Sequence, residues 1–322
     1  MAEIAHRFVD TNGIRMHIAE TGPAEGALVV LCHGFPESWY SWRHQLQALG
    51  DAGYHVVAPD QRGYGETDAP EPIEAYTQLH LVGDIIGLLD VLDAPTAVIA
   101  GHDWGAPVAW NTALWRPDRI RAVIGLSVPF TPRAPMRPTQ LLDMLAGESF
   151  MYILYFQQPG VAEANLGADV RKSIRGFMYV ASGDVDPSEI TWGQRGRDAT
   201  MTDHFVDPKV LPSWLTDADV DFYTGEFERV GFRGGLNWYR NIDRTWELTA
   251  AWSGAVVTPP ALFIAGTRDG VIAMNPSAVD RLPTVVPNLR RTVMLEGCGH
   301  WTQQERPDDV NAALLEFLAS LG

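Results

Sequence analysis

The chain has 322 residues, of which 46% are hydrophobic and 20% charged, and its formal net charge is −16. An excess of acidic residues disfavours binding to nucleic acids and to anionic membrane surfaces, because both repel a negatively charged protein. No apolar run approaches the roughly 20 residues of a membrane span, and the first residues lack the pattern of a signal peptide. Two cysteines, Cys32 and Cys298, provide no disulfide framework. We therefore expect a globular, cytoplasmic protein.

The first predicted element is a β-hairpin. Residues 7–11 and 14–18 alternate around Asn12-Gly13, a dipeptide typical of two-residue hairpin turns. Short apolar runs then predict strands that are buried on both faces of a sheet. These runs cover residues 27–32, 55–58, 97–100 and 122–126. Amphipathic segments of helical length lie between them, including 42–52 and 79–92, and this alternation predicts a mostly parallel α/β sheet.

The pattern changes between residues 131 and 246, where Trp, Tyr, Phe and Met gather in segments typical of helices. A proline-rich stretch, residues 129–138, opens this region, and strand-like runs resume only at 261–265 and 292–295. We therefore predict one sheet domain made of residues 1–130 and 247–322, interrupted by a helical cap of residues 131–246. No internal repeat is visible, which argues against a solenoid.

The segment Gly101-His-Asp103-Trp-Gly105 follows a predicted strand and precedes a predicted helix. It matches the nucleophile elbow, in which small residues flank a strained, exposed nucleophile, with Asp in the place of Ser. The alternative is a surface turn in which Asp103 only caps the helix 106–115. The position between a buried strand and a helix favours the nucleophile. A carboxylate can displace a leaving group at a saturated carbon and form an ester that water then hydrolyses.

Two further residues come after the last two predicted strands. Asp269 lies in Gly266-Thr-Arg-Asp269-Gly270, and His300 lies in Gly299-His300-Trp301. The chain order of nucleophile, acid and base is that of α/β-hydrolases. Each residue taken alone could be an ordinary loop residue. Together, they predict that His300 activates water and that Asp269 orients its imidazole.

The segment His33-Gly34-Phe35-Pro36 follows the first buried strand. A tight turn there could direct the Phe35 backbone N–H toward the nucleophile, where it would form an oxyanion hole with the Trp104 N–H. The alternative is a plain Gly-Pro turn. We expect Glu37 and His102, which lie beside these motifs, to be structural.

These motifs resemble those of epoxide hydrolases related to the C-terminal domain of mammalian soluble epoxide hydrolase, and of their bacterial relatives. The cap segments 150–160 and 235–241 carry the more specific part of the likeness, which spans nearly the whole chain. The resemblance implies Asp103 as nucleophile, His300 as base and Asp269 as its partner. It also implies a cis peptide before Pro36.

The resemblance further assigns Tyr152 and Tyr239 as cap tyrosines that hydrogen-bond and protonate the epoxide oxygen, with Tyr155 as the alternative to Tyr152. Phenols with a pKa near roughly 10 stay neutral at pH 7 and can donate to the departing oxygen. We expect the apolar wall of the substrate pocket to include Pro36, Trp39, Phe130, Met151, Tyr155, Phe156, Met178 and Trp301.

The expected activity is hydrolysis of an apolar epoxide to a vicinal diol by a monomer or homodimer that needs no metal or organic cofactor, with detoxification as one role. A haloalkane dehalogenase is the main alternative, although such enzymes often carry Asn or Glu where this chain has Phe35. A fluoroacetate-type dehalogenase would instead have Arg at the position of Trp104. A silent small-molecule receptor of the same fold need not retain nucleophile, base, acid and both phenols.

Overall fold

The computed structural model of the chain describes residues 3–191 and 194–322. Within these residues eight strands form one sheet in the order β1-β2-β4-β3-β5-β6-β7-β8. The strands are β1 (Ala5–Thr11), β2 (Ile14–Thr21), β3 (Leu28–Cys32), β4 (His55–Pro59), β5 (Ala97–His102), β6 (Ile120–Leu126), β7 (Ala261–Gly266) and β8 (Leu289–Leu295). β1 and β2 form the antiparallel hairpin and β2 also pairs antiparallel with β4, whereas the other neighbours are parallel. The predicted mostly parallel sheet with an N-terminal hairpin is confirmed.

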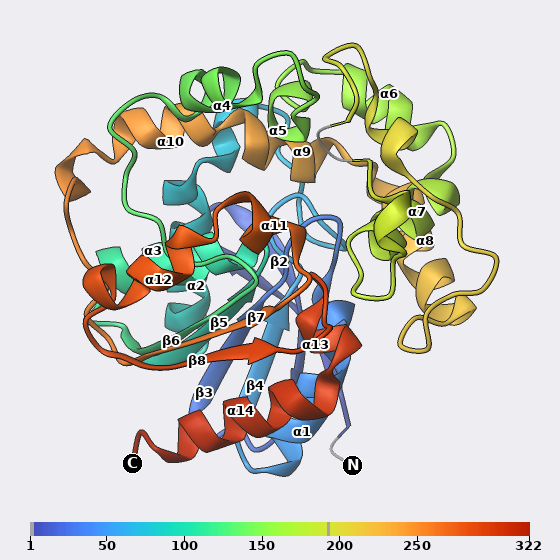
Figure 1. Cartoon of the computed structure of the whole chain (residues 1–322). Helices are drawn as coiled ribbons and strands as arrows, with labels where there is room; N and C mark the ends of the chain where they lie inside the picture. The colour runs from blue at the N-terminus through green and yellow to red at the C-terminus, as the bar shows by residue number, and fades with distance from the viewer. Residues whose placement is uncertain (1–2, 192–193) are drawn as a thin grey trace.

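Helices cover both faces of this sheet (Figure 1). α1 (Arg43–Asp51) and α14 (Pro307–Ala319) pack on one face, and α2 (Gln78–Val91) and α3 (Gly105–Trp115) pack on the other. Successive strand residues point to opposite faces, so Val30 joins one apolar cluster and Val29 the other. Every residue of β3, β5 and β7 is therefore buried, which explains why these strands read as continuous apolar runs.

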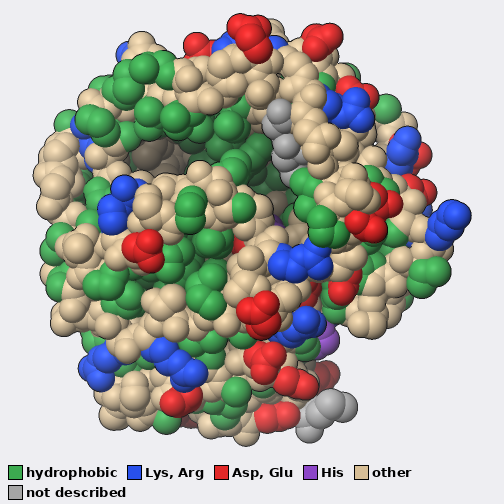
Figure 2. Space-filling view, viewed as in Figure 1, with side chains coloured by type: hydrophobic (Ala, Val, Ile, Leu, Met, Phe, Trp, Pro, Cys, Tyr) green, Lys and Arg blue, Asp and Glu red, His purple; other side chains and the backbone are tan. Residues whose placement is uncertain are grey.

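The chain between β6 and β7 forms an arch of helices above the sheet (Figure 1). Its helices are α4 (Pro138–Ala146), α5 (Tyr152–Tyr155), α6 (Val161–Gly167), α7 (Val170–Val180), α8 (Asp217–Val230), α9 (Arg233–Arg240) and α10 (Ile242–Leu248), with short 3-10 helices η3 (Pro187–Glu189), η4 (Met201–His204) and η5 (Ala250–Trp252). The predicted cap limits, 131 and 246, stay a prediction, and the second of them falls within α10. Figure 2 shows a hollow below α4 and α10 with many apolar side chains around it.

The remaining helices lie in the core part of the chain. They are η1 (Trp39–Trp42), η2 (Ile73–Tyr76), α11 (Gly270–Met274), α12 (Ser277–Val285) and α13 (Thr302–Glu305). The parallel strands end at one edge of the sheet, and the loops that leave β3, β5, β7 and β8 carry Phe35, Asp103, Asp269 and His300. This edge is where ligands bind in open α/β sheets. Across the described ranges, no helix has both the length and the hydrophobicity to cross a membrane.

Candidate active site

Asp103 stands at the tight turn between β5 and α3 with a φ of 50°. Residues other than glycine rarely adopt this left-handed region, so the conformation is strained and depends on its surroundings. Both flanking glycines are required by close packing. A Cβ on Gly101 would overlap the Gly105 carbonyl oxygen, and a Cβ on Gly105 would overlap the Cys32 carbonyl oxygen. The strained turn presents the Asp103 carboxylate at the carboxyl end of the sheet.

The three residues predicted to form the triad are brought together. Asp103 Oδ2 lies 3.4 Å from His300 Nε2, and His300 Nδ1 lies 3.1 Å from each carboxylate oxygen of Asp269. The side chain of Asp269 is fully buried, whereas 14% of the Asp103 side chain stays exposed. The paired contact with Asp269 directs the Nδ1–H toward that carboxylate and leaves Nε2 facing the nucleophile.

The charges of the triad influence one another. Burial alone would raise the pKa of Asp103, but hydrogen bonding from His300 and the positive charges of His300 and His102 outweigh it and hold that pKa below its ordinary value. Burial would lower the pKa of His300, but the charges and hydrogen bonds of Asp269 and Asp103 raise it well above the ordinary value. The resting site therefore favours an ionised nucleophile beside an imidazolium.

The turn after β3 contributes a backbone donor. The Phe35 N–H donates to Asp103 Oδ1 over 2.7 Å, and the Phe35–Pro36 peptide bond is cis, as the resemblance implies. Trp104 follows Asp103 directly, at the start of α3. If the Asp103 carboxylate became an ester and water attacked it, negative charge would develop on the oxygen that is not bonded to the substrate. An N–H that already donates to that oxygen would stabilise this charge. The participation of the Trp104 N–H stays a prediction.

Two tyrosines of the cap lie side by side. The ring centroids of Tyr152, at the start of α5, and Tyr239, in α9, are 6.0 Å apart. Tyr239 also packs 5.0 Å from Trp104 and 5.6 Å from Phe35. Burial and then the negative charge of Asp103 raise the pKa of both phenols. Both therefore keep their protons at neutral pH and can act as hydrogen-bond donors close to the nucleophile.

Comparison with known proteins agrees with this geometry. Residues 27–307 match the family described as alpha/beta hydrolase fold. The chain is 49% identical over 325 residues to epoxide hydrolase A of Mycobacterium tuberculosis, which covers 100% of this chain and 99% of that protein. The crystal structure of epoxide hydrolase A from Mycobacterium thermoresistibile is 51% identical, with a TM-score of 0.94 and 98% of each chain covered. An epoxide hydrolase from an endophytic Streptomyces is 48% identical, with a TM-score of 0.94 over 99% and 96% of the two chains.

The chain belongs to the epoxide hydrolases of the α/β-hydrolase fold. In this epoxide hydrolase the alternative tyrosine, Tyr155, packs away from the triad, with its ring 5.5 Å from that of Phe150. The charged groups that raise the pKa of Tyr155 are Asp203 and Glu163, after burial, rather than the triad carboxylates. The structure thus places Tyr152, and not Tyr155, near the nucleophile.

Several residues expected in the pocket wall lie beside the triad and the cap tyrosines. Phe156 packs 5.9 Å from Phe35 and 5.0 Å from Tyr239. The Trp301 ring lies 4.9 Å from that of His300, and its indole N–H donates to the Met178 carbonyl over 2.9 Å. Pro36 follows the Phe35 donor, and Met151 immediately precedes α5.

Two other expected pocket residues pack against aromatic rings, and their place in the pocket wall stays a prediction. Trp39 packs against His6 and Phe222, with ring centroids 4.7 and 5.9 Å apart. Phe130 packs against Trp110, which belongs to α3. Aromatic character correctly indicated that these side chains are partly or fully buried, but it carried no information about which wall they join.

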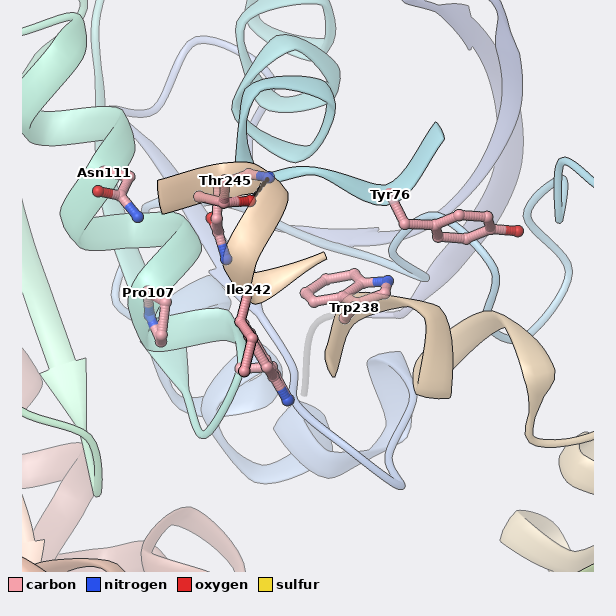
Figure 3. Close-up of a pocket in the computed structure, with 8 residues that line it drawn as sticks. Tyr76, Pro107, Asn111, Trp238, Ile242 and Thr245 are labelled. Atoms are coloured by element: carbon pink, nitrogen blue, oxygen red, sulfur yellow. Dashed lines mark hydrogen bonds between the residues drawn. The ribbon is translucent and has the colours of Figure 1, made fainter. Parts of the chain in front are cut away.

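A cavity of about 140 Å³ borders Trp104 between the core and the cap (Figure 3). Figure 3 shows Pro107 and Asn111 contributed by α3 and Ile242 and Thr245 by α10. The full lining is Tyr76, Gln78, Trp104, Pro107, Asn111, Trp238, Ile242 and Thr245. Apart from Trp104, the sequence predicted none of these residues. Among the described residues, no group of three or more His, Cys, Asp or Glu side chains is arranged to hold a metal ion.

Glu37 and His102 form a fully buried polar pair behind the triad. His102 Nδ1 lies 2.8 Å from Glu37 Oε2, and His102 Nε2 lies 2.7 Å from the His300 carbonyl oxygen. Because the His300 carbonyl oxygen can only accept, His102 Nε2 donates to it, and Nδ1 shares a proton with the Glu37 carboxyl group. Glu37 Oε2 also accepts from the Gly34 N–H. The pair thus joins the Phe35 turn, the elbow and the His300 loop, contacts that fit the expected structural role and that the sequence alone did not specify. Its only signal in the sequence was adjacency to the motifs.

Proposed function

We propose that this enzyme converts an apolar epoxide and water to a vicinal diol through an ester on Asp103. The observation that carries the proposal is the surroundings of the Asp103 carboxylate. One oxygen, Oδ1, accepts the Phe35 N–H, and the other faces His300. Two phenols, the half-buried Tyr152 and the buried Tyr239, lie close enough for the charge of Asp103 to raise their pKa. The many apolar groups around the cap favour an apolar substrate.

In the first step, Asp103 Oδ2 attacks an epoxide carbon from the side opposite the breaking C–O bond. A new C–O bond forms between the carboxylate and that carbon, and the ring oxygen departs as an alkoxide. Tyr152 and Tyr239 donate hydrogen bonds to this oxygen, and one phenol transfers its proton to it. The Trp104 ring packs edge-on against the Tyr239 ring, with the ring centroids 5.0 Å apart, which helps to orient that phenol.

In the second step, water attacks the Asp103 ester carbon. Formation of the ester removes the negative charge of Asp103, one of the two charges that raise the pKa of His300 in the resting enzyme. The pKa of His300 therefore falls, and its proton returns to the phenolate that the first step left. Nε2 can then accept a proton from water while Asp269 stabilises the imidazolium that results. The oxyanion develops on Oδ1, where the Phe35 N–H and the proposed Trp104 N–H stabilise it. The ester C–O bond breaks, and the departing oxygen takes the proton that remains on the added hydroxyl group. The diol then leaves, and the oxygen of the water remains on Asp103 as part of its carboxylate.

A single turnover with excess enzyme and styrene oxide in oxygen-18 water tests this order of bonds. We expect the first diol to be largely unlabelled, because its new oxygen comes from the Asp103 carboxylate, and label to appear in later turnovers. Asp103→Asn serves as the control that forms no ester. Immediate full labelling would mean that water attacks the epoxide directly. If the protein released halide from a bromoalkane but formed no diol from any epoxide, the dehalogenase alternative would be favoured. If it acted on neither substrate, the small-molecule receptor would be favoured.

A further inference from the structure

Glu305, at the end of α13, is a carboxylate with 5% of its surface exposed and no role in the proposed reaction. Its Oε1 accepts the Trp301 N–H over 3.0 Å, and its Oε2 accepts the Gly299 and Gly183 N–H groups over 2.9 Å each. Gly299 and Trp301 flank His300 in the chain, whereas Gly183 lies in the turn that follows α7. One buried carboxylate therefore joins the loop of the catalytic base to the cap.

The same two segments touch directly through their backbones. The His300 N–H donates to the Ala181 carbonyl over 2.8 Å. A Cβ on Gly183 would overlap the Gly297 carbonyl oxygen, and a Cβ on Gly299 would overlap the Gly183 nitrogen. We call residues 181–185 the cap turn and residues 297–301 the base loop. Contact this close leaves the base loop little freedom as long as the cap turn stays in place.

We propose that Glu305 is a positioning residue that couples the cap turn to the base loop and so sets the rate of ester hydrolysis. The attack on the epoxide uses Asp103, Tyr152 and Tyr239, which other elements hold in place. Water activation uses His300, whose neighbouring peptide groups Glu305 binds on both sides. Loss of Glu305 should therefore slow the second step while leaving the first nearly unchanged. Burial raises the pKa of Glu305, and its three N–H bonds oppose that rise, which keeps an anion tenable there.

Glu305→Gln is the informative substitution because it keeps the size of the side chain and replaces one acceptor oxygen with an NH₂ group. Whichever way the amide turns, that NH₂ group faces a backbone donor: either the Trp301 N–H or the pair from Gly299 and Gly183. The N–H that loses its acceptor stays buried, and the base loop must shift to satisfy it. Displacement of a catalytic group by about 1 Å can cost about a hundredfold in rate, so we expect hydrolysis to slow by at least about tenfold.

The proposal rests on the two-step function and is tested by rapid quenching of single turnovers with styrene oxide, following the protein-bound ester and the diol separately. Glu316→Gln is the matched control, since it also removes one carboxylate but from the exposed surface of α14. In Glu305→Gln we expect ester to form within twofold of the unmodified rate and to accumulate. A merely less-folded variant would lower the amplitude of both phases and leave both rate constants unchanged.

Arg268→Met provides a second variant in case Glu305→Gln does not fold. The Arg268 side chain is exposed and donates to the Gly183 and Val185 carbonyls of the cap turn, so its loss leaves no buried charge. We expect slower hydrolysis here too, by a smaller factor. The proposal would be overturned if Glu305→Gln hydrolysed the ester within twofold of the unmodified rate, or if it slowed both steps equally. If Glu305→Gln does not fold, an unchanged rate of hydrolysis in Arg268→Met would overturn it. His300→Gln distinguishes failure of the Glu305 proposal from failure of the proposed two-step function. If His300→Gln accumulates no ester, the two-step function itself is wrong.

Discussion

Replacement of Tyr152 with Phe removes one of the two phenol donors proposed to receive the epoxide oxygen. The ring itself remains, so its packing 5.7 Å from Phe156 and 6.0 Å from Tyr239 is kept. The loss is then mainly one hydrogen bond to a developing alkoxide. A hydrogen bond to a charged group contributes about 1.5–3 kcal/mol. Since about 1.4 kcal/mol corresponds to tenfold in rate, formation of the ester should slow by about 10- to 150-fold.

The rate of ester formation under single-turnover conditions is the quantity to measure, because steady-state turnover also contains the hydrolysis step. Tyr179→Phe is the matched control, since the Tyr179 hydroxyl bonds to Glu189 near the surface. Tyr155→Phe tests the alternative assignment and should change the rate by less than about twofold, because its ring packs on Phe150. Equal rates in Tyr152→Phe and the unmodified enzyme, or a larger loss in Tyr155→Phe, would refute the assignment of Tyr152.

Three other substitutions probe the site. His300→Gln should form one ester per enzyme and then stall, which the mass of the intact protein reports; multiple turnovers at the unmodified rate would contradict the role of His300. Asp103→Asn should lower the pKa of His300, because Asp103 is one of the two carboxylates that raise that pKa. An NMR titration of the imidazole measures the change, and an unchanged pKa would show that Asp103 does not contribute to it. Glu37→Gln breaks the fully buried Glu37–His102 pair, so the free energy of unfolding in urea should fall by about 3–5 kcal/mol. A loss below about 1 kcal/mol would contradict a stabilising role of this pair.

Local sequence patterns were sufficient to predict those parts of the structure that depend on residues close together in the chain. The hairpin follows from alternation around Asn12-Gly13, and the elbow follows from two glycines that permit the positive φ of Asp103. The buried strands are visible because parallel strands covered on both faces must be continuously apolar. Asp269 and His300 could be predicted because the carboxyl ends of β7 and β8 lie at the same edge of the sheet as the elbow.

The arrangement of the cap and the contacts behind the triad could be obtained only from the tertiary structure. For aromatic residues such as Trp39 and Phe130, hydrophobicity predicts burial but not direction, so their place in the pocket wall stays a prediction. For the same reason, the spacing of Tyr152 and Tyr155 alone did not show which of the two faces the nucleophile. The polar contacts that hold His300 join residues 198 positions apart, His102 to His300, and 122 positions apart, Gly183 to Glu305. Helical and strand periodicities extend over a few residues, so they cannot specify such pairs, which form only when the sheet and cap pack together.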